Sequence, residues 1–148
     1  MLHTRIMDII RGKLGDRRDD YALPPPVFTL MYGEFLEYDQ GSKTLTNRFP
    51  VLKDYLNPYG TMQGGMVAAA ADNTFGPLSM LVAPPSVTRR IEVKYSNSIT
   101  TDLEFIIVKA TFLEREDRWL RFKAEVRDPG GKLLARAWSQ HWIVDEEH

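Results

Sequence analysis

The pattern of apolar and polar positions predicts one helix that is apolar on every face. Residues 64–82 read GGMVAAAADNTFGPLSMLV, with small and apolar side chains all round the first two turns. A helix of this kind is buried on all sides or spans a membrane. Because Asp72, Asn73 and Pro77 interrupt a run that is already short for a bilayer, we expect a core helix and no membrane span.

The rest of the chain reads mainly as strands. A hairpin is expected first, and four further strands follow the apolar helix; the ranges are 27–38, 43–51, 87–95, 103–114, 118–127 and 133–144. In 118–127, apolar Phe122, Ala124 and Val126 alternate with charged residues, which is typical of an antiparallel strand with one solvated face. One antiparallel sheet that curls around the helix satisfies both patterns and predicts an α+β fold.

The two ends of the chain carry weaker patterns. Residues 2–14 have apolar side chains at helical spacing, which predicts a short amphipathic helix that ends at Gly15. The prolines of Leu23–Pro26 predict an extended connector before the first strand. The polar tail, 145–148, is expected to be frayed.

Composition narrows the class of protein. A chain of 148 residues fits one domain, 1–148, and its net charge of −1 gives no general attraction to nucleic acid. The absence of cysteine excludes disulfides and thiolate catalysis. We expect no metal site, because no two of the three histidines have metal-ligand spacing, and we expect His141 to be a strand histidine without a chemical role. No signal peptide is apparent, so the expected location is the cytoplasm.

The start of the apolar helix is a candidate site for a substrate oxygen. The first turn of a helix has backbone N–H groups without intrahelical partners, at the positive end of the helix dipole. Since Gly64 and Gly65 carry no side chain, an oxyanion can approach these groups closely. The alternative is that the two glycines only allow tight packing against the sheet.

Asp72 is a second candidate, because a carboxylate in an apolar helix is costly and burial raises its pKa. It suits general-base or nucleophilic work, unless it is a structural aspartate beside a local break. Gly64 and Asp72 are eight residues apart, which is ~12 Å along a helix. One carbonyl cannot contact both, so a shared site requires Asp72 from a second copy and predicts a dimer with paired helices.

Further candidates flank the helix. The side-chain amide of Asn57 can donate to a carbonyl or hold a water, or Asn57 is simply a turn residue before a proline. Arg89, Arg90 and Lys94 form a basic cluster after the helix. They are either a solvated strand face or a contact for the phosphates of coenzyme A.

Together these residues resemble a known family. The run Asn57-Pro-Tyr-Gly-Thr-Met-Gln-Gly-Gly65, followed by Asp72 after an alanine-rich stretch, is similar to the signature of hotdog-fold acyl-CoA thioesterases, in the phenylacetic-acid-degradation (PaaI-like) branch. Asn57, Gly60, Gly64, Gly65 and Asp72 match it. The resemblance implies a curved antiparallel sheet around one long helix, assembled as homodimers or homotetramers.

The resemblance also implies roles. The Gly64 amide would polarise the thioester carbonyl, Asn57 would position the carbonyl or the water, and Asp72 of the neighbouring subunit would act as base or nucleophile. Thr88 falls where the family often carries a Ser or Thr that orients the water. Gly60, Gln63, Gly65 and the Arg89–Arg90 pair are the expected substrate-binding residues, with coenzyme A as part of the substrate and no separate cofactor.

One position departs from the family, because Gln63 stands where it usually has histidine. A glutamine amide can donate and accept, so it can replace a histidine that holds the loop, but it does not titrate near neutral pH. This keeps open a non-catalytic acyl-CoA- or lipid-binding protein. A hotdog hydratase or dehydratase is disfavoured, because the sequence places no histidine near Gly64 or Asp72.

Overall fold

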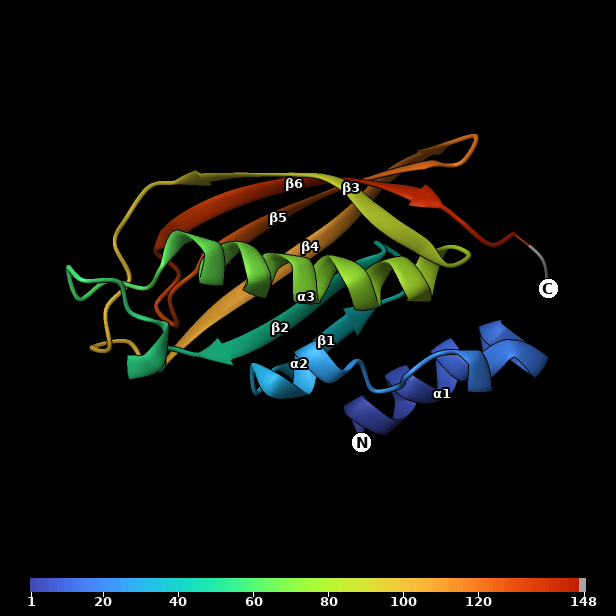
Figure 1. Cartoon of the computed structure of the whole chain (residues 1–148), viewed down its shortest axis with the longest axis horizontal. Helices are drawn as coiled ribbons and strands as arrows, with labels where there is room; N and C mark the ends of the chain where they lie inside the picture. Colours follow the sequence, from blue (N-terminus) through green and yellow to red (C-terminus); the bar gives the residue numbers. More distant parts are fainter. Residues whose placement is uncertain (147–148) are drawn as a thin grey trace.

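The computed structural model describes residues 1–146, and the last two residues of the predicted polar tail, 147–148, lie outside the described residues. Its centre is a six-stranded antiparallel sheet in the order β1-β2-β4-β5-β6-β3. The long helix α3 lies across one face of this curved sheet (Figure 1). The predicted α+β arrangement of a sheet around one helix is confirmed.

Element bounds follow the predicted pattern closely except between residues 15 and 34. In chain order the elements are α1 (Leu2–Leu14), the 3-10 turn η1 (Gly15–Asp20), α2 (Pro26–Leu30), β1 (Glu34–Asp39), β2 (Thr44–Pro50), η2 (Lys53–Tyr55), α3 (Gly64–Val82), β3 (Ser86–Tyr95), β4 (Phe105–Glu116), β5 (Trp119–Arg127) and β6 (Leu133–Ile143). The predicted ranges 2–14 and 64–82 are confirmed as helices.

The predicted strand 27–38 is wrong in its first half. Pro26 begins the short helix α2, where a missing backbone N–H costs nothing, and the strand starts only at Glu34. Gly33 is required at the turn between them, because a Cβ there would lie 2.7 Å from the Phe28 ring. The turn stacks Phe28 on Phe35 with 4.5 Å between ring centroids. Aromatic packing therefore decides the conformation of this segment.

The core lies between α3 and the sheet. Ala70 and Ala71 are fully buried and let the helix approach closely, while Phe75 packs against Phe122 of β5 at 6.0 Å between ring centroids. The amine of Lys13 in α1 donates to the carbonyl of Leu81 at 3.1 Å, at the C-terminal end of α3 where carbonyls lack helical partners.

The expectation that α3 is buried on every side is wrong. α1 and α2 lie along one side of it (Figure 1), but a stripe on another flank stays open to solvent. Gly65 and Asp72 are exposed there, and Ala68, Ala69 and Gly76 are partly exposed. This flank lies beside β3, one of the two edge strands of the sheet, none of whose residues is buried. One chain therefore leaves an apolar helix flank and a strand edge uncovered together.

The start of the polar tail is held in place. Asp145 accepts a hydrogen bond from the Tyr21 hydroxyl at 3.0 Å and forms an ion pair with Arg17, and Glu146 pairs with Arg115. The expected fraying is therefore wrong for Asp145 and Glu146. The contacts of Asp145 join this part of the chain to the segment after α1, and the contact of Glu146 joins it to β4.

Candidate functional site

The first turn of α3 presents free backbone donors. Gln63 precedes the helix, and its carbonyl accepts hydrogen bonds from the N–H groups of Met66 at 2.8 Å and Val67 at 3.2 Å. The N–H groups of Gly64 and Gly65 stand before these in the turn, where a helix offers no acceptor. The arrangement is chemically suited to hold a negatively charged oxygen.

Gln63 holds the loop through its backbone and not through its side chain. Its N–H donates to the carbonyl of Tyr55 at 2.8 Å, whereas its side chain is exposed and makes no capping hydrogen bond. The idea that the glutamine amide takes over a loop-holding role is thus wrong for this structure. The backbone of Gln63 holds the loop, and its side chain stays accessible to solvent.

Asn57 and Gly60 shape the loop that leads into α3. The Asn57 carbonyl oxygen Oδ1 accepts from the backbone N–H of Tyr59 at 3.0 Å and of Thr61 at 3.1 Å, and its amide donates to the Thr61 hydroxyl at 2.8 Å. Gly60 has a φ of 81°, which favours glycine. The turn-residue interpretation of Asn57 describes these contacts, and a direct contact with substrate stays a prediction.

Sequence reasoning missed Tyr95, at the end of β3. Its hydroxyl donates to the Gly64 carbonyl at 2.5 Å, and a Cβ on Gly64 would lie 3.2 Å from the hydroxyl oxygen. Loss of surrounding water raises the pKa of Tyr95, so the phenol keeps its proton at neutral pH. Only the register of β3 against β6 brings this residue to the helix, so no local pattern could have identified it.

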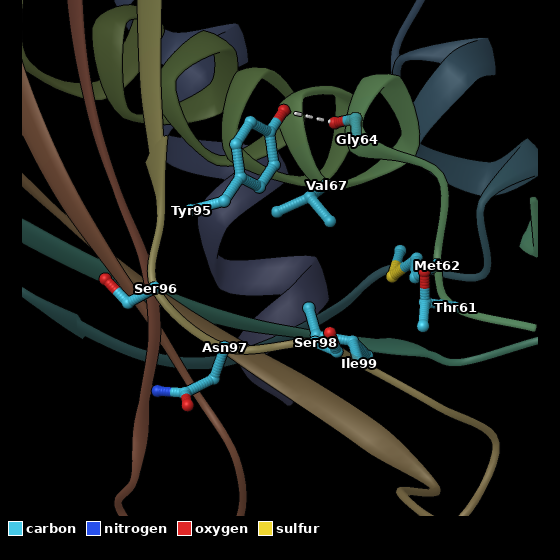
Figure 2. Close-up of a pocket in the computed structure, with 9 residues that line it drawn as sticks. All are labelled: Thr61, Met62, Gly64, Val67, Tyr95, Ser96, Asn97, Ser98 and Ile99. Carbon is cyan, nitrogen blue, oxygen red and sulfur yellow. Dashed lines mark hydrogen bonds between the residues drawn. The ribbon is translucent and has the colours of Figure 1, made fainter. Parts of the chain in front are cut away.

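A cavity of about 330 Å³ opens beside this contact. Figure 2 shows Tyr95 pointing to the first turn of α3 and Val67 pointing into the space between them and the segment after β3. The lining residues are Thr61, Met62, Gly64, Val67 and 95–99. Gly64 is therefore the one predicted site residue that lines this cavity.

Asp72 lies in the middle of α3 on its open flank. Its Oδ1 accepts a hydrogen bond from the Thr88 hydroxyl at 3.1 Å, so the structure brings two of the predicted catalytic residues together. Packing of protein atoms around the carboxyl group removes part of its water and raises the pKa of Asp72, while the hydrogen bond from Thr88 acts in the opposite direction. The carboxylate is held by a side chain and stays exposed.

His141 lies closer to this pair than the sequence suggested. It is the register partner of Thr88 across β3 and β6, and its Nε2 is 3.5 Å from the Thr88 hydroxyl oxygen. The argument that no histidine lies near Asp72 was therefore wrong, because strand pairing joins positions 53 residues apart. His141 is 1% exposed, however, so it has no access to a substrate.

The other predicted positions are spread over the molecule. Arg89 lies at the β3 bulge with its guanidinium 6.0 Å from the Trp142 ring, and Arg90 pairs with Glu92 at 4.0 Å. Arg90 faces away from α3, because its register partner Gln140 is adjacent to the inward-facing His141 and strand residues alternate between faces. Within one chain, neither arginine joins Gly64 or Asp72 in a common site.

The described residues, 1–146, lack a membrane-spanning helix and a cluster of metal ligands. No helix among them has the length and apolar character needed to cross a bilayer. They also hold no group of three or more His, Cys, Asp or Glu side chains placed to bind a metal ion.

Comparison with known proteins places the fold. No family model matches the sequence, and no curated protein matches it. Among solved structures, a phenylacetic acid degradation-related protein from Ralstonia eutropha, provisionally assigned as a thioesterase, superposes with a TM-score of 0.78 at 20% identity, over 93% of this chain and 98% of that one. A variant of the phenylacetic acid degradation protein PaaI from Thermus thermophilus gives 0.70 at 20% identity, over 80% and 99%.

A third similar structure contains coenzyme A. This provisionally assigned thioesterase from Streptococcus pneumoniae gives a TM-score of 0.70 at 14% identity, over 78% of this chain and 88% of that one. Two further structures of this protein each carry one alanine replacement, of an aspartate and of a threonine. The architecture of sheet and helix, together with these neighbours, shows that this chain has the hotdog fold of the PaaI-like proteins.

Proposed function

We propose that this protein hydrolyses acyl-CoA thioesters at a site formed by two copies of the chain. The observation that carries the proposal is the Asp72–Thr88 pair, held in a fixed geometry yet exposed on the open flank of α3. No described residue occupies the second oxygen of Asp72, Oδ2. That oxygen is available to take a proton from a water molecule.

Two copies are required because the donors and the base are apart. The free N–H groups of Gly64 and Gly65 are ~10–12 Å from Asp72 along the same helix. A second copy placed against the open flank of α3 and the edge of β3 would bring its own Asp72 towards these donors. The small residues Ala69 and Gly76 allow such an approach, since a Cβ added at Gly76 meets no atom within 4 Å.

The chemistry is an addition followed by an elimination. Asp72 of one copy takes a proton from water while the water oxygen attacks the thioester carbonyl carbon. The resulting oxyanion is stabilised by the N–H groups of Gly64 and Gly65 of the other copy. The carbon–sulfur bond then breaks, and the thiolate of coenzyme A receives the proton, which yields the acid and the free thiol. Direct attack by Asp72 would instead give a mixed anhydride that water hydrolyses.

Two comparisons support this proposal. A structural neighbour is bound to coenzyme A. In that protein the aspartate and threonine replaced by alanine are sixteen positions apart, which is also the separation of Asp72 and Thr88 here.

The test is hydrolysis of a panel of acyl-CoA esters, followed by release of free thiol. We expect Asp72→Asn to lower kcat by about 10²–10⁴-fold, the usual contribution of a general base, while binding of acyl-CoA measured by calorimetry is retained. Asp54→Asn, an exposed aspartate in η2, is the matched control and should behave as wild type. Equal activity of Asp72→Asn and wild type would contradict the proposal.

A binding protein without turnover is the second candidate. It is favoured by Gln63, whose exposed side chain makes no capping bond at the position of the family histidine. Calorimetric binding of acyl-CoA with no thiol release by the wild type would establish it. A hydratase remains disfavoured, now because His141 is buried and not because a histidine is missing.

A further inference from the structure

A buried histidine stands behind the proposed base and has no role in the chemistry above. His141 is fully enclosed between α3 and the sheet, with the Phe122 ring of β5 at 4.9 Å between ring centroids. Its Nδ1 is 3.2 Å from the Ser86 hydroxyl oxygen, and its Nε2 is 3.5 Å from that of Thr88. Both ring nitrogens therefore have polar partners on β3.

The donors and acceptors in this cluster allow its hydrogen bonds to run in one direction only. Asp72 as a carboxylate can only accept, so the Thr88 hydroxyl donates its single proton to Oδ1. Thr88 then offers only lone pairs to His141, which must carry its proton on Nε2. The bare Nδ1 accepts from the Ser86 hydroxyl. The result is a chain of donors that runs Ser86, His141, Thr88, Asp72.

We propose that His141 is a positioning residue for the thioesterase reaction: it fixes the Thr88 hydroxyl so that this group donates to Asp72. Without a donor behind it, the Thr88 hydroxyl is free to rotate away, and Asp72 loses its one side-chain partner among the described residues. This inference rests on the proposed function for its kinetic consequence, but the direction of the hydrogen-bond chain is a property of the folded protein alone.

Burial keeps His141 in the state that the chain requires. The groups facing it are the Ser86 and Thr88 hydroxyls of β3, the Phe122 ring of β5 and, through Thr88, Asp72 of α3. Within residues 1–146 no carboxylate contacts the ring directly, and desolvation lowers the pKa of His141 to about 4. The ring is therefore neutral at neutral pH, with one donor and one acceptor nitrogen.

Three variants separate positioning from simple packing. His141→Gln keeps an amide donor near the position of Nε2, whereas His141→Phe fills the space with no donor. Ser139→Ala is the matched control, because Ser139 is buried on the same face of β6 and its hydroxyl has no hydrogen-bond partner among the described residues. Circular dichroism and the oligomeric state show which variants fold.

The kinetic readout is the pH dependence of kcat. Loss of the hydrogen bond to the carboxylate raises the pKa of Asp72, so the acid limb of His141→Phe moves to higher pH. On that limb, where Asp72 is mostly protonated in both proteins, kcat falls about tenfold for a shift of one pH unit. At high pH the deficit shrinks. We expect Ser139→Ala to match wild type and His141→Gln to recover most of the loss. Equal, pH-independent losses in both His141 variants would overturn the proposal.

A second readout does not need activity. In the ¹⁵N NMR spectrum, His141 of the wild type is expected as the neutral form protonated on Nε2, and the ¹³C-detected titration of Asp72 is expected to shift upwards in His141→Phe. If the wild type shows no hydrolysis but these signals behave as stated, the proposed function fails, whereas the orientation of the Thr88 hydroxyl by His141 stands. Protonation on Nδ1, or an unchanged Asp72 titration, refutes the positioning role even in an active enzyme.

Discussion

The two edges of the sheet differ in what covers them. At the β1 edge, Phe35 and Tyr38 are buried, α1 packs on the strand, and Phe28 of α2 stacks on Phe35. At the β3 edge no residue is buried, and the adjacent flank of α3 is open as well. An edge strand with free backbone groups and apolar side chains invites pairing with another chain. The chain therefore covers one edge itself and leaves the other open, and this open edge is where we propose that the second copy pairs.

A charge placed on each edge tests this difference most directly. Ile91 on β3 is 36% exposed and Leu36 on β1 is 41% exposed, so the two positions are matched. We expect Ile91→Lys to convert the proposed dimer to a monomer and to lower kcat at least as far as loss of Asp72 does, because the site needs both copies. Leu36→Lys should leave association and activity unchanged. Sedimentation velocity measures the state, and an active monomer of Ile91→Lys contradicts the shared site.

The helices that cover the β1 edge, α1 and α2, are expected to contribute to the stability of the fold and not to kcat. Ile10 of α1 is fully buried, so Ile10→Ala should lower the free energy of unfolding by about 2–5 kcal/mol through lost burial and a residual cavity. The folded variant should keep its kcat. Leu30→Ala, at an exposed position of α2, is the control and should change stability by less than about 0.5 kcal/mol. Urea denaturation measures both, and equal losses would contradict the packing assigned to α1.

The edges also differ in their response to acid. The folded pKa of His141, about 4, lies below its ordinary value of 6.5, so the unfolded chain binds the extra proton first. The contribution of neutral His141 to the free energy of unfolding is then fully present above pH 6.5. It falls by about 3 kcal/mol as the pH drops to 4. At the β1 edge, hydrogen bonds from the Ser42 hydroxyl and the Ser42 and Gly41 N–H groups lower the pKa of Asp39, so its contribution is lost only below pH 3.8.

The measurement is the free energy of unfolding in urea between pH 4 and pH 8. Relative to wild type, His141→Gln should show a flatter dependence between pH 6.5 and pH 4, since glutamine does not titrate. Asp39→Asn should change the profile only at lower pH. Parallel wild-type and His141→Gln curves in the upper window would contradict the buried, neutral state of His141.

The smallest effect is expected for the arginines of β3. Arg89→Ala should raise KM for acyl-CoA a few-fold, because an exposed ion pair with a phosphate contributes about 1 kcal/mol to binding. KM for a short acyl thioester without the nucleotide should not change. Arg90→Ala should change KM less, because Arg90 faces away from α3 and pairs with Glu92. Steady-state kinetics with both substrates decides this. Equal effects on the two substrates would argue against a contact with the nucleotide.

Local patterns determined much of this molecule. The apolar run with Gly64 at its start and two prolines beyond its end fixes α3, and the alternation in 118–127 fixes an antiparallel strand, because both signals depend only on neighbouring residues. The strand prediction for the segment after Pro26 was wrong because it, too, depended only on neighbouring residues. A proline disfavours helix in the residue before it, but it is also a good first residue of a helix. Packing of Phe28 on Phe35 decides for the helix here.

The pairing of β3 with β6 decided the rest. It sets His141 beneath Thr88 and Tyr95 beside Gly64, and it leaves the flank of α3 that carries Asp72 uncovered. These positions are far apart in the sequence. No local periodicity encodes which of them become neighbours on one face of the folded sheet. The sequence by itself determined the central helix and most of the strands, and it named candidate site residues. The tertiary structure alone decided which of them touch, because strand register and burial are properties of the whole packed chain.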